Sequence, residues 1–213
     1  METKRQILVA TTNPGKVSEL SAMLDADVKW RILSEFDDLE EVTEDGLTFA
    51  ENARKKALGY ARQAEIWTIS DDSGLVVDAL DGAPGVKSAR FSGEKLPDKK
   101  RGLLDEKNMQ KVLELMEGVP NKERTCRFKC FLCLASPQEI LLETEGTLEG
   151  IISDRQIGIN GFGYDPIFFV PDLGKTVAQL KPEKKNSISH RADAIKKMKP
   201  KLDDLLKEKT LFD

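Results

Sequence analysis

Gln6-Ile7-Leu8-Val9-Ala10-Thr11-Thr12-Asn13-Pro14-Gly15-Lys16 is the stretch that decides the fold class. Its first part, Gln6 to Thr11, is short and apolar, which is typical of a buried strand. Asn13-Pro14-Gly15 then predicts a turn. Apolar residues at helical spacing predict a helix from Lys16 to Ala26. A buried strand that leads directly into a helix is the repeating unit of α/β proteins.

The rest of the chain continues this alternation. Thr48 and Glu51 have the spacing of a capping box, so a helix is expected from Thr48 to about Ala64. Helices that interleave with strands predict an α/β fold with a mixed sheet. Further strands are expected at 28–33, 66–70, 75–79, 124–135, 139–147 and 167–170, and further helices at 99–116 and 187–209, the last capped by Ser187.

Composition limits the organisation and the partners of the protein. The 213 residues are 39% hydrophobic, which predicts one domain over residues 1–213, with one body or two lobes. The 33 basic and 37 acidic side chains give a net charge of −4. This balance argues against non-specific binding of nucleic acid, which needs a large basic patch. A small anionic ligand needs only a local cationic cluster or a metal.

The cysteines indicate the compartment. Cys126, Cys130 and Cys133 lie within one predicted strand, and with one distant histidine in the chain they do not form a zinc pattern. They are expected to be buried thiols in a reducing compartment. We expect no signal peptide and no membrane-spanning segment, because the apolar run Ile7 to Ala10 is too short for either. The predicted location is therefore the cytoplasm.

Two segments have the chemistry to handle phosphates and a metal. Lys16 follows a strand-to-helix turn whose backbone N–H groups and helix dipole favour an anion, although an ordinary turn with an exposed lysine is an alternative. Asp71-Asp72-Ser73-Gly74 ends an apolar strand, and paired carboxylates there suit Mg²⁺. The alternative is a solvated turn. Glu44 is a candidate second carboxylate, or one more charge in an acidic run.

Two further segments have the chemistry to hold a nucleoside. Phe162 and Tyr164 are separated by one glycine, so in an extended segment the rings face the same way and one or both can stack on a base, the alternative being a pair of core aromatic rings. Asp165 can accept hydrogen bonds from purine N–H groups, unless the segment is a core turn. Lys181 to Arg191 holds a cationic cluster with His190, and it is either a triphosphate site or a solvated face. For Lys196, Lys197 and Lys199 a solvated face is expected.

Together these segments resemble the inosine triphosphate pyrophosphatases, which hydrolyse nonstandard purine nucleoside triphosphates to the monophosphate and pyrophosphate. Each motif alone is modest, but their joint order over nearly the whole chain is specific. The matching segments are Thr-Thr-Asn-Pro-Gly-Lys at 11–16, Glu-Asp-Gly-Leu-Thr-Phe-Ala-Glu-Asn-Ala at 44–53, Asp-Asp-Ser-Gly-Leu at 71–75, Gly-Ala-Pro-Gly-Val-Lys-Ser-Ala-Arg-Phe-Ser-Gly at 82–93, Gly-Phe-Gly-Tyr-Asp-Pro at 161–166 and Ser-Ile-Ser-His-Arg at 187–191.

The resemblance implies a role for each matching residue. Asp72 is implied to be the catalytic base and a Mg²⁺ ligand, with Glu44 as a second metal carboxylate. Phe162 is implied to stack on the base, and Lys16 to contact the phosphates. The full set of implied substrate contacts is Thr11, Thr12, Asn13, Pro14, Gly15, Lys16, Ser73, Phe162, Gly163, Tyr164, Asp165, Lys185, His190 and Arg191.

The resemblance also implies a fold and an assembly. It implies an elongated, two-lobed α/β fold with a long mixed central sheet flanked by helices, an active-site cleft between the lobes, and a homodimer. One departure is Gly158-Ile159-Asn160-Gly161, where family members often carry Gly-Thr-Gly. This changes the backbone freedom of the loop before Phe162.

The expected reaction is attack of water on the α-phosphorus of ITP, dITP or XTP, with pyrophosphate leaving. This reaction removes deaminated purines from the nucleotide pool. Donors from Arg191 or the backbone to O6 favour hypoxanthine and xanthine over adenine, but guanine also carries O6. Two alternatives stay open: another nucleotide phosphohydrolase, and a nucleotide-binding sensor without chemistry. The paired carboxylates argue against the sensor, because they repel a triphosphate unless a metal intervenes.

Overall fold

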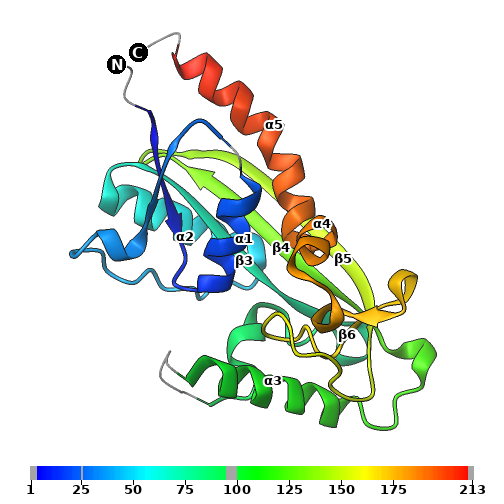
Figure 1. Cartoon of the computed structure of the whole chain (residues 1–213). Coiled ribbons are helices and arrows are strands. Elements are labelled where there is room, and N and C mark those ends of the chain that lie inside the picture. The colour runs from blue at the N-terminus through cyan, green and yellow to red at the C-terminus, as the bar shows by residue number, and fades with distance from the viewer. Residues whose placement is uncertain (1–3, 25, 95–99, 211–213) are drawn as a thin grey trace. The chain divides into compact units, whose positions relative to one another are not determined.

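The computed structural model describes residues 4–24, 26–94 and 100–210 and shows an α/β fold (Figure 1). The described strands form a seven-stranded sheet in the order β2-β1-β3-β4-β5-β6-β7. The sheet is mixed, because β1 pairs in parallel with β2 and β3, whereas β6 pairs antiparallel with β5 and β7. The predicted class, a mixed sheet flanked by helices, is confirmed.

The elements have the following bounds. The strands are β1 (Gln6–Ala10), β2 (Lys29–Ile32), β3 (Trp67–Val77), β4 (Thr125–Ala135), β5 (Ile140–Ile152), β6 (Phe168–Val170) and β7 (Lys175–Thr176). The helices are α1 (Pro14–Met23), α2 (Phe49–Ala64), α3 (Arg101–Leu115), α4 (Pro182–Ile188) and α5 (His190–Thr210). Lys99, the first residue of one predicted helix, lies outside the described residues.

The contacts divide the chain into two units. Unit 1 comprises 1–72, 130–146 and 191–213, and unit 2 comprises 73–129 and 147–190. The strands β3, β4 and β5 each contribute residues to both units. The prediction of a single domain over residues 1–213 stays a prediction.

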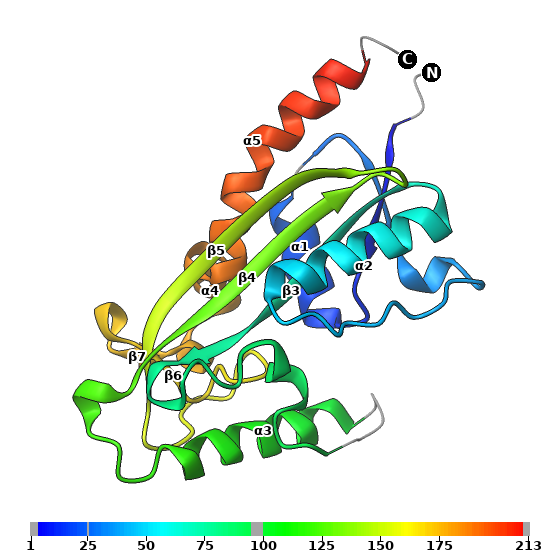
Figure 2. The same ribbon diagram turned by 180° about the vertical axis from the view of Figure 1, so that it is seen from behind.

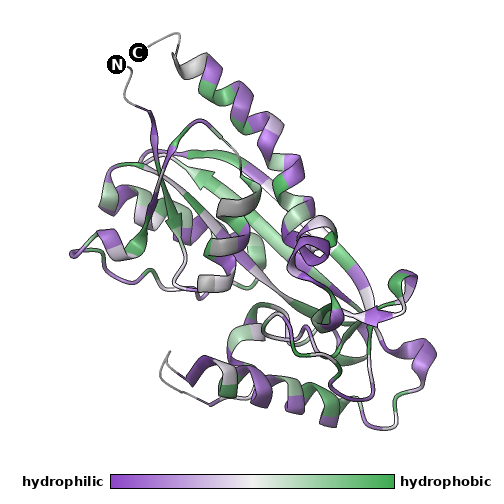
Figure 3. Cartoon of the chain, viewed as in Figure 1, coloured by the Kyte–Doolittle hydropathy of each residue, from purple (hydrophilic) through white to green (hydrophobic). Residues whose placement is uncertain are grey.

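Unit 1 is a helix–sheet–helix sandwich. One face of its strands packs against α1 and α5 through side chains such as Leu20, Leu132 and Ile195. The other face packs against α2, where Ala53, Ala57 and Ala61 contact β4, and Figure 2 shows α2 lying across the strands. Both faces are therefore covered, and Figure 3 shows the resulting apolar colouring along the strands.

Unit 2 has its own core. The ends of β3, β4 and β5 pack with β6 and α3 through a cluster that includes Val77, Met109, Phe128, Tyr164 and Phe168. Phe128 and Phe168 stack at 4.2 Å between ring centroids. The exposed positions of α3 carry the polar residues Glu106, Gln110 and Glu114 and also Leu103 and Leu115.

The prediction of a break at Asp71-Asp72-Ser73-Gly74 was wrong, because β3 runs through these residues as one strand. Acidic residues followed by a glycine indicate a turn when the carboxylates have no partner other than water. Here Asp71 is buried among cations, which lets the strand continue. Gly74 marks a close approach instead, since a Cβ there would lie 2.7 Å from the carbonyl oxygen of Gly85.

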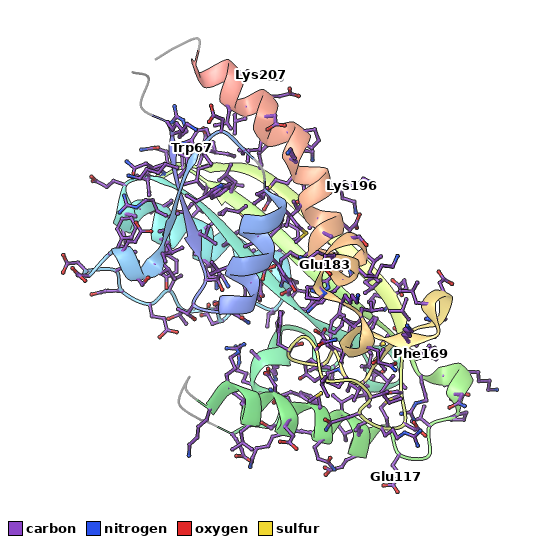
Figure 4. All side chains as sticks on the ribbon, viewed as in Figure 1. Trp67, Glu117, Phe169, Glu183, Lys196 and Lys207 are labelled. Atoms are coloured by element: carbon purple, nitrogen blue, oxygen red, sulfur yellow. The ribbon has the colours of Figure 1, made fainter. Side chains whose placement is uncertain are left out.

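The last predicted helix is also divided. α4 begins at Pro182, so Ser187 is not its N-cap, and the Ser187 hydroxyl donates to the carbonyl oxygen of Lys184 at 2.8 Å. Ser189, with φ −65° and ψ 156°, is extended and separates α4 from α5. Figure 4 shows Lys196 on α5, and Lys196 and Lys197 are exposed, as expected for a solvated face, whereas Lys199 is half-buried.

Two predictions concern the environment of the protein, namely buried thiols and no membrane-spanning segment. The three cysteines are buried and carry no disulfide, as expected for structural thiols. Burial raises the pKa of each thiol, that of Cys133 to about 12, so these groups are inert as nucleophiles. In the described part of the chain, no helix combines the length and apolarity that crossing a membrane requires.

Candidate active site

The two carboxylates on β3 point into different surroundings within unit 1. Neighbouring residues of a strand project from opposite faces of the sheet, so Asp71 and Asp72 have different partners. Asp71 is 0% exposed and Asp72 is 8% exposed. Carboxylates this deeply buried need compensating charges or hydrogen bonds.

Asp71 is the centre of a buried ion network. The guanidinium of Arg191, 1% exposed, donates from Nε to Oδ2 of Asp71 at 2.9 Å and also pairs with Glu19 on α1. The ammonium of Lys16 pairs with Oδ1 of Asp71. Burial acts to raise the pKa of Asp71, but Arg191 and Lys16 outweigh it and hold the pKa well below its ordinary value. Asp71 is therefore ionised at neutral pH.

Asp72 lies among a different set of side chains. Burial raises its pKa, and the proximity of Glu44 adds to this rise. Lys16, Lys56 and a hydrogen bond with Asn52 act in the opposite direction and reduce the rise without cancelling it. A carboxylate whose pKa is raised in this way is a stronger base than an ordinary aspartate.

Helix α2 holds Glu44 near Asp72. Lys56 donates to Oε2 of Glu44 at 2.8 Å, and Asn52 accepts from the Gly46 backbone N–H at 2.7 Å. The loop that carries Glu44 is thus fixed at two points. The sequence interpretation missed Asn52 and Lys56, although polar side chains four residues apart on the packing face of a helix are a detectable signal.

Helix α1 begins at Pro14, two residues before the predicted start at Lys16, and ends at Met23 rather than Ala26, so the predicted turn at Asn13-Pro14-Gly15 is the N-cap and the first two residues of the helix. Asn13 is the N-cap, and its Oδ1 accepts from the Gly15 backbone N–H at 2.9 Å. The Thr11 hydroxyl accepts from the Asn13 N–H at 3.2 Å, and Thr12 is exposed. Pro14 occupies the first helical turn, where its missing N–H has no cost. These contacts place Lys16 beside Asp71, so its charge is already paired in this structure.

The aromatic segment of unit 2 is a turn rather than an extended stretch. Gly161 and Gly163 have φ values of +79° and +60°, which reverse the chain direction and separate the two rings. Phe162 is half-buried, whereas Tyr164 is buried in the core and its hydroxyl donates to the Ser88 carbonyl oxygen at 2.7 Å. The segment is therefore not extended, the condition under which both rings would face the same way is not met, and Phe162 is the less buried of the two rings.

Asp165 organises this turn. Its Oδ2 accepts from the Phe162 backbone N–H at 3.0 Å and from the Lys185 ammonium at 2.6 Å. The same ammonium lies 4.1 Å from the centre of the Phe162 ring, within range of a cation–π interaction. Phe162, Asp165 and Lys185 thus form one cluster, as the sequence grouping of aromatic, carboxylate and cation predicted.

The remaining predicted residues are divided between the units. His190 is 8% exposed and its ring stacks on Phe128 in unit 2, with centroids 4.9 Å apart. Arg191 belongs to unit 1, where it pairs with Asp71 and Glu19. Ser73 lies on β3 and belongs to unit 2.

The described residues hold no group of three or more acidic, histidine or cysteine side chains arranged to bind a metal. An all-protein metal cage is therefore not present in this part of the chain. A pair of carboxylates, Asp72 and Glu44, is still compatible with Mg²⁺, which commonly takes one or two protein carboxylates and completes its shell with water and phosphate oxygens.

Known proteins with similar sequences and structures point to one family. The model of the Ham1 family matches residues 7–201. A dITP/XTP pyrophosphatase of Listeria monocytogenes is 44% identical over 206 residues, which covers 96% of this chain and 98% of that protein. A solved structure of a HAM1 protein from Coxiella burnetii superposes with a TM-score of 0.84 at 37% identity, covering 94% of this chain and 99% of that one.

Proposed function

Since this chain belongs to the Ham1 family, we propose that it hydrolyses noncanonical purine nucleoside triphosphates to the monophosphate and pyrophosphate. The substrates proposed are ITP, dITP and XTP. The observation that carries the proposal is the buried carboxylate Asp72, which has a raised pKa and lies near Glu44, Lys16 and Lys56 in unit 1. Such a group is suited to take a proton from water beside an anionic substrate.

A divalent metal, with Mg²⁺ as the proposed ion, fits the residues near Asp72. Asp72 and Glu44 would hold it, because Asp72 lies within range of the charge of Glu44 and a cation would relieve the repulsion between the two carboxylates. When bound, Mg²⁺ neutralises phosphate charge and lowers the pKa of a bound water. The two lysines near these carboxylates keep the net local charge low without the metal.

The chain's own groups divide the chemical work. Asp72 accepts the proton of the water that attacks the α-phosphorus. Lys16 stabilises the negative charge that builds on the leaving pyrophosphate, together with the backbone N–H groups of the α1 terminus that Thr11 to Lys16 form. Lys185 is proposed to add a second cation for the phosphates, which requires it to exchange its contact with Asp165 for the substrate.

Unit 2 is proposed to recognise the base. Phe162 stacks on the purine, and Gly163 and Asp165 present backbone and carboxylate groups to its edge. Tyr164 supports the loop from the core. His190, with Ser73, is proposed to complete the substrate contacts. The burial and pairing of Arg191 favour an indirect role, in which it holds Asp71 and thereby Lys16.

The location of the protein and its assembly are proposed as well. We propose a cytoplasmic location, since the three thiols are reduced and a nucleotide pool is the substrate source. We also propose a homodimer, on the basis of the family resemblance. Sedimentation velocity tests the dimer, which a monomer at micromolar concentration would contradict.

One experiment separates the proposed function from its alternatives. The protein is incubated with ITP, XTP, dITP, ATP or GTP and Mg²⁺, and pyrophosphate and orthophosphate are measured separately. Pyrophosphate from ITP, dITP and XTP, with little from ATP, supports the proposal. Orthophosphate as the product supports another phosphohydrolase, and no product from any nucleotide supports a binding protein.

A further inference from the structure

The base loop, residues 161–165, is held at three places within unit 2. Asp165 holds the Phe162 N–H at 3.0 Å, and Tyr164 is fixed by burial and by its bond to Ser88. The middle of the loop is held differently. The Gly163 backbone N–H donates to Oδ2 of Asp105, on α3, at 3.0 Å.

Packing does not explain the position of Gly163. A Cβ built at Gly163 would meet no atom within 4 Å, so this part of the loop has open space beside it. Its φ of +60° is one that glycine adopts without steric cost, so it does not by itself select this loop conformation. The hydrogen bond to Asp105 is therefore the contact that holds the middle of the loop.

Helix α3 gives Asp105 a rigid base. Three residues further along, Asn108 accepts from the Ser92 N–H at 2.7 Å and donates to the Ala89 carbonyl oxygen at 3.3 Å. Met109 and Val112 are buried in the core of unit 2. Asp105 lies on this anchored side of the helix, so its carboxylate has a defined place.

We propose that Asp105 is a positioning residue for base recognition, which fixes the Gly163 amide so that the adjacent Phe162 ring is presented to a purine. This inference rests on the proposed function. No motif in the sequence of α3 indicated it, because the contact joins positions 58 residues apart. Asp105 contacts the loop through the Gly163 amide, so its proposed effect on a purine acts through the loop and Phe162.

The cost of the arrangement supports a role beyond packing. Asp105 is half-buried, and burial raises its pKa, an effect that the Gly163 N–H and Arg101 only partly offset. Partly burying a carboxylate is unfavourable unless it makes a strong contact. A carboxylate that accepts from a backbone N–H makes a stronger bond than a neutral acceptor.

Steady-state kinetics with ITP and Mg²⁺ test the proposal. Asp105→Ala removes the acceptor, whereas Asp105→Asn keeps a neutral oxygen that can accept from Gly163. Glu106→Ala is the matched control, because it removes an exposed carboxylate from the next position of α3. Base stacking contributes to ground-state and transition-state binding alike, so its loss raises KM and leaves kcat largely unchanged.

The expected KM of Asp105→Ala is about 10-fold above that of the wild type, with kcat within about 2-fold. Asp105→Asn should raise KM by about 3-fold, and Glu106→Ala should match the wild type. An Asp105→Ala protein that is folded and has a wild-type KM overturns the proposal. If Asp105→Ala does not fold, Asp105→Asn decides, and a wild-type KM in that variant together with unchanged amide exchange overturns the proposal.

Amide exchange provides a readout that does not depend on turnover. The chain has 15 glycines, so ¹⁵N-glycine labelling gives a small set of signals, and Gly163→Ala identifies that of Gly163. The Gly163 amide should exchange about 10-fold faster in Asp105→Ala than in the wild type. Equal exchange rates overturn the proposal. If the wild type hydrolyses no nucleotide, the proposed function fails, while faster exchange still supports the contact from Asp105.

Discussion

Arg191 donates from Nε to Oδ2 of Asp71 at 2.9 Å, although the two residues are 120 positions apart in the chain. The same guanidinium pairs with Glu19, and the same carboxylate pairs with Lys16. A residue at the start of α5 therefore pairs with the Asp71 carboxylate of β3, which in turn holds Lys16 at the start of α1.

Asp72→Asn should abolish most of the pyrophosphatase activity and leave the fold intact. The amide cannot accept the proton of the attacking water, and removal of a general base lowers kcat by about 100-fold to 10⁴-fold. Pyrophosphate release from ITP measures the effect, and circular dichroism checks the fold. Near-normal turnover in this variant would rule out Asp72 as the base.

Arg191→Ala should strongly destabilise unit 1. It leaves the buried carboxylates of Asp71 and Glu19 without their main cation, and breaking such a pair costs about 3–5 kcal/mol of unfolding free energy. Urea denaturation measures the change. Lys197→Ala is the control, because its pair with Asp193 is exposed and should contribute less than about 1 kcal/mol. Equal stability of the two variants would contradict the assigned role of the buried network.

Asp71 should make the protein less stable in acid. Its pKa is lower in the folded state than in the unfolded chain, so its contribution is fully present above about pH 4, the ordinary pKa of aspartate, and is lost as the pH falls further towards the folded value. Urea denaturation at pH 7 and at pH 3 should show a smaller loss for Asp71→Asn than for the wild type. An identical loss in both proteins would show that other groups cause the acid sensitivity.

Gly74→Ala should destabilise unit 2. The added methyl group would lie 2.7 Å from the Gly85 carbonyl oxygen and 2.8 Å from Cβ of Ser88, and such overpacking costs about 1–3 kcal/mol. Gly102→Ala is the matched control on α3, where a Cβ meets nothing within 4 Å. Because alanine favours the helix, Gly102→Ala should be neutral or stabilising by up to about 1 kcal/mol. Thermal unfolding compares the two, and a stable Gly74→Ala protein would argue against the close approach.

The sequence predicted much of the local structure. The strand at 6–10, the start of a helix near Asn13 and the cap at Thr48 all have short-range causes, namely side-chain burial, backbone geometry and capping hydrogen bonds, although α1 begins at Pro14 where a turn was expected. The residue types of the candidate site could also be identified from the sequence. Carboxylates, lysines and aromatic rings that occur together in this order indicate a site for a nucleotide and a metal. The order of these motifs along the chain indicated the family.

Only the tertiary structure decided how the charges are paired and which rings are exposed. The sequence predicted that β3 breaks at Asp71, but Arg191, on α5, pairs with the Asp71 carboxylate, and the strand continues. The residue types alone did not distinguish Phe162 from Tyr164, although the family resemblance did, and in the structure a turn with positive φ values at the glycines accompanies the burial of Tyr164 in the core. The sequence interpretation gave no role to α3, whose Asp105 contacts the base loop. The contacts of Asp71 with Arg191 and of Gly163 with Asp105 join residues far apart in the chain, and no local pattern can specify the partner of a charge that folding brings from elsewhere.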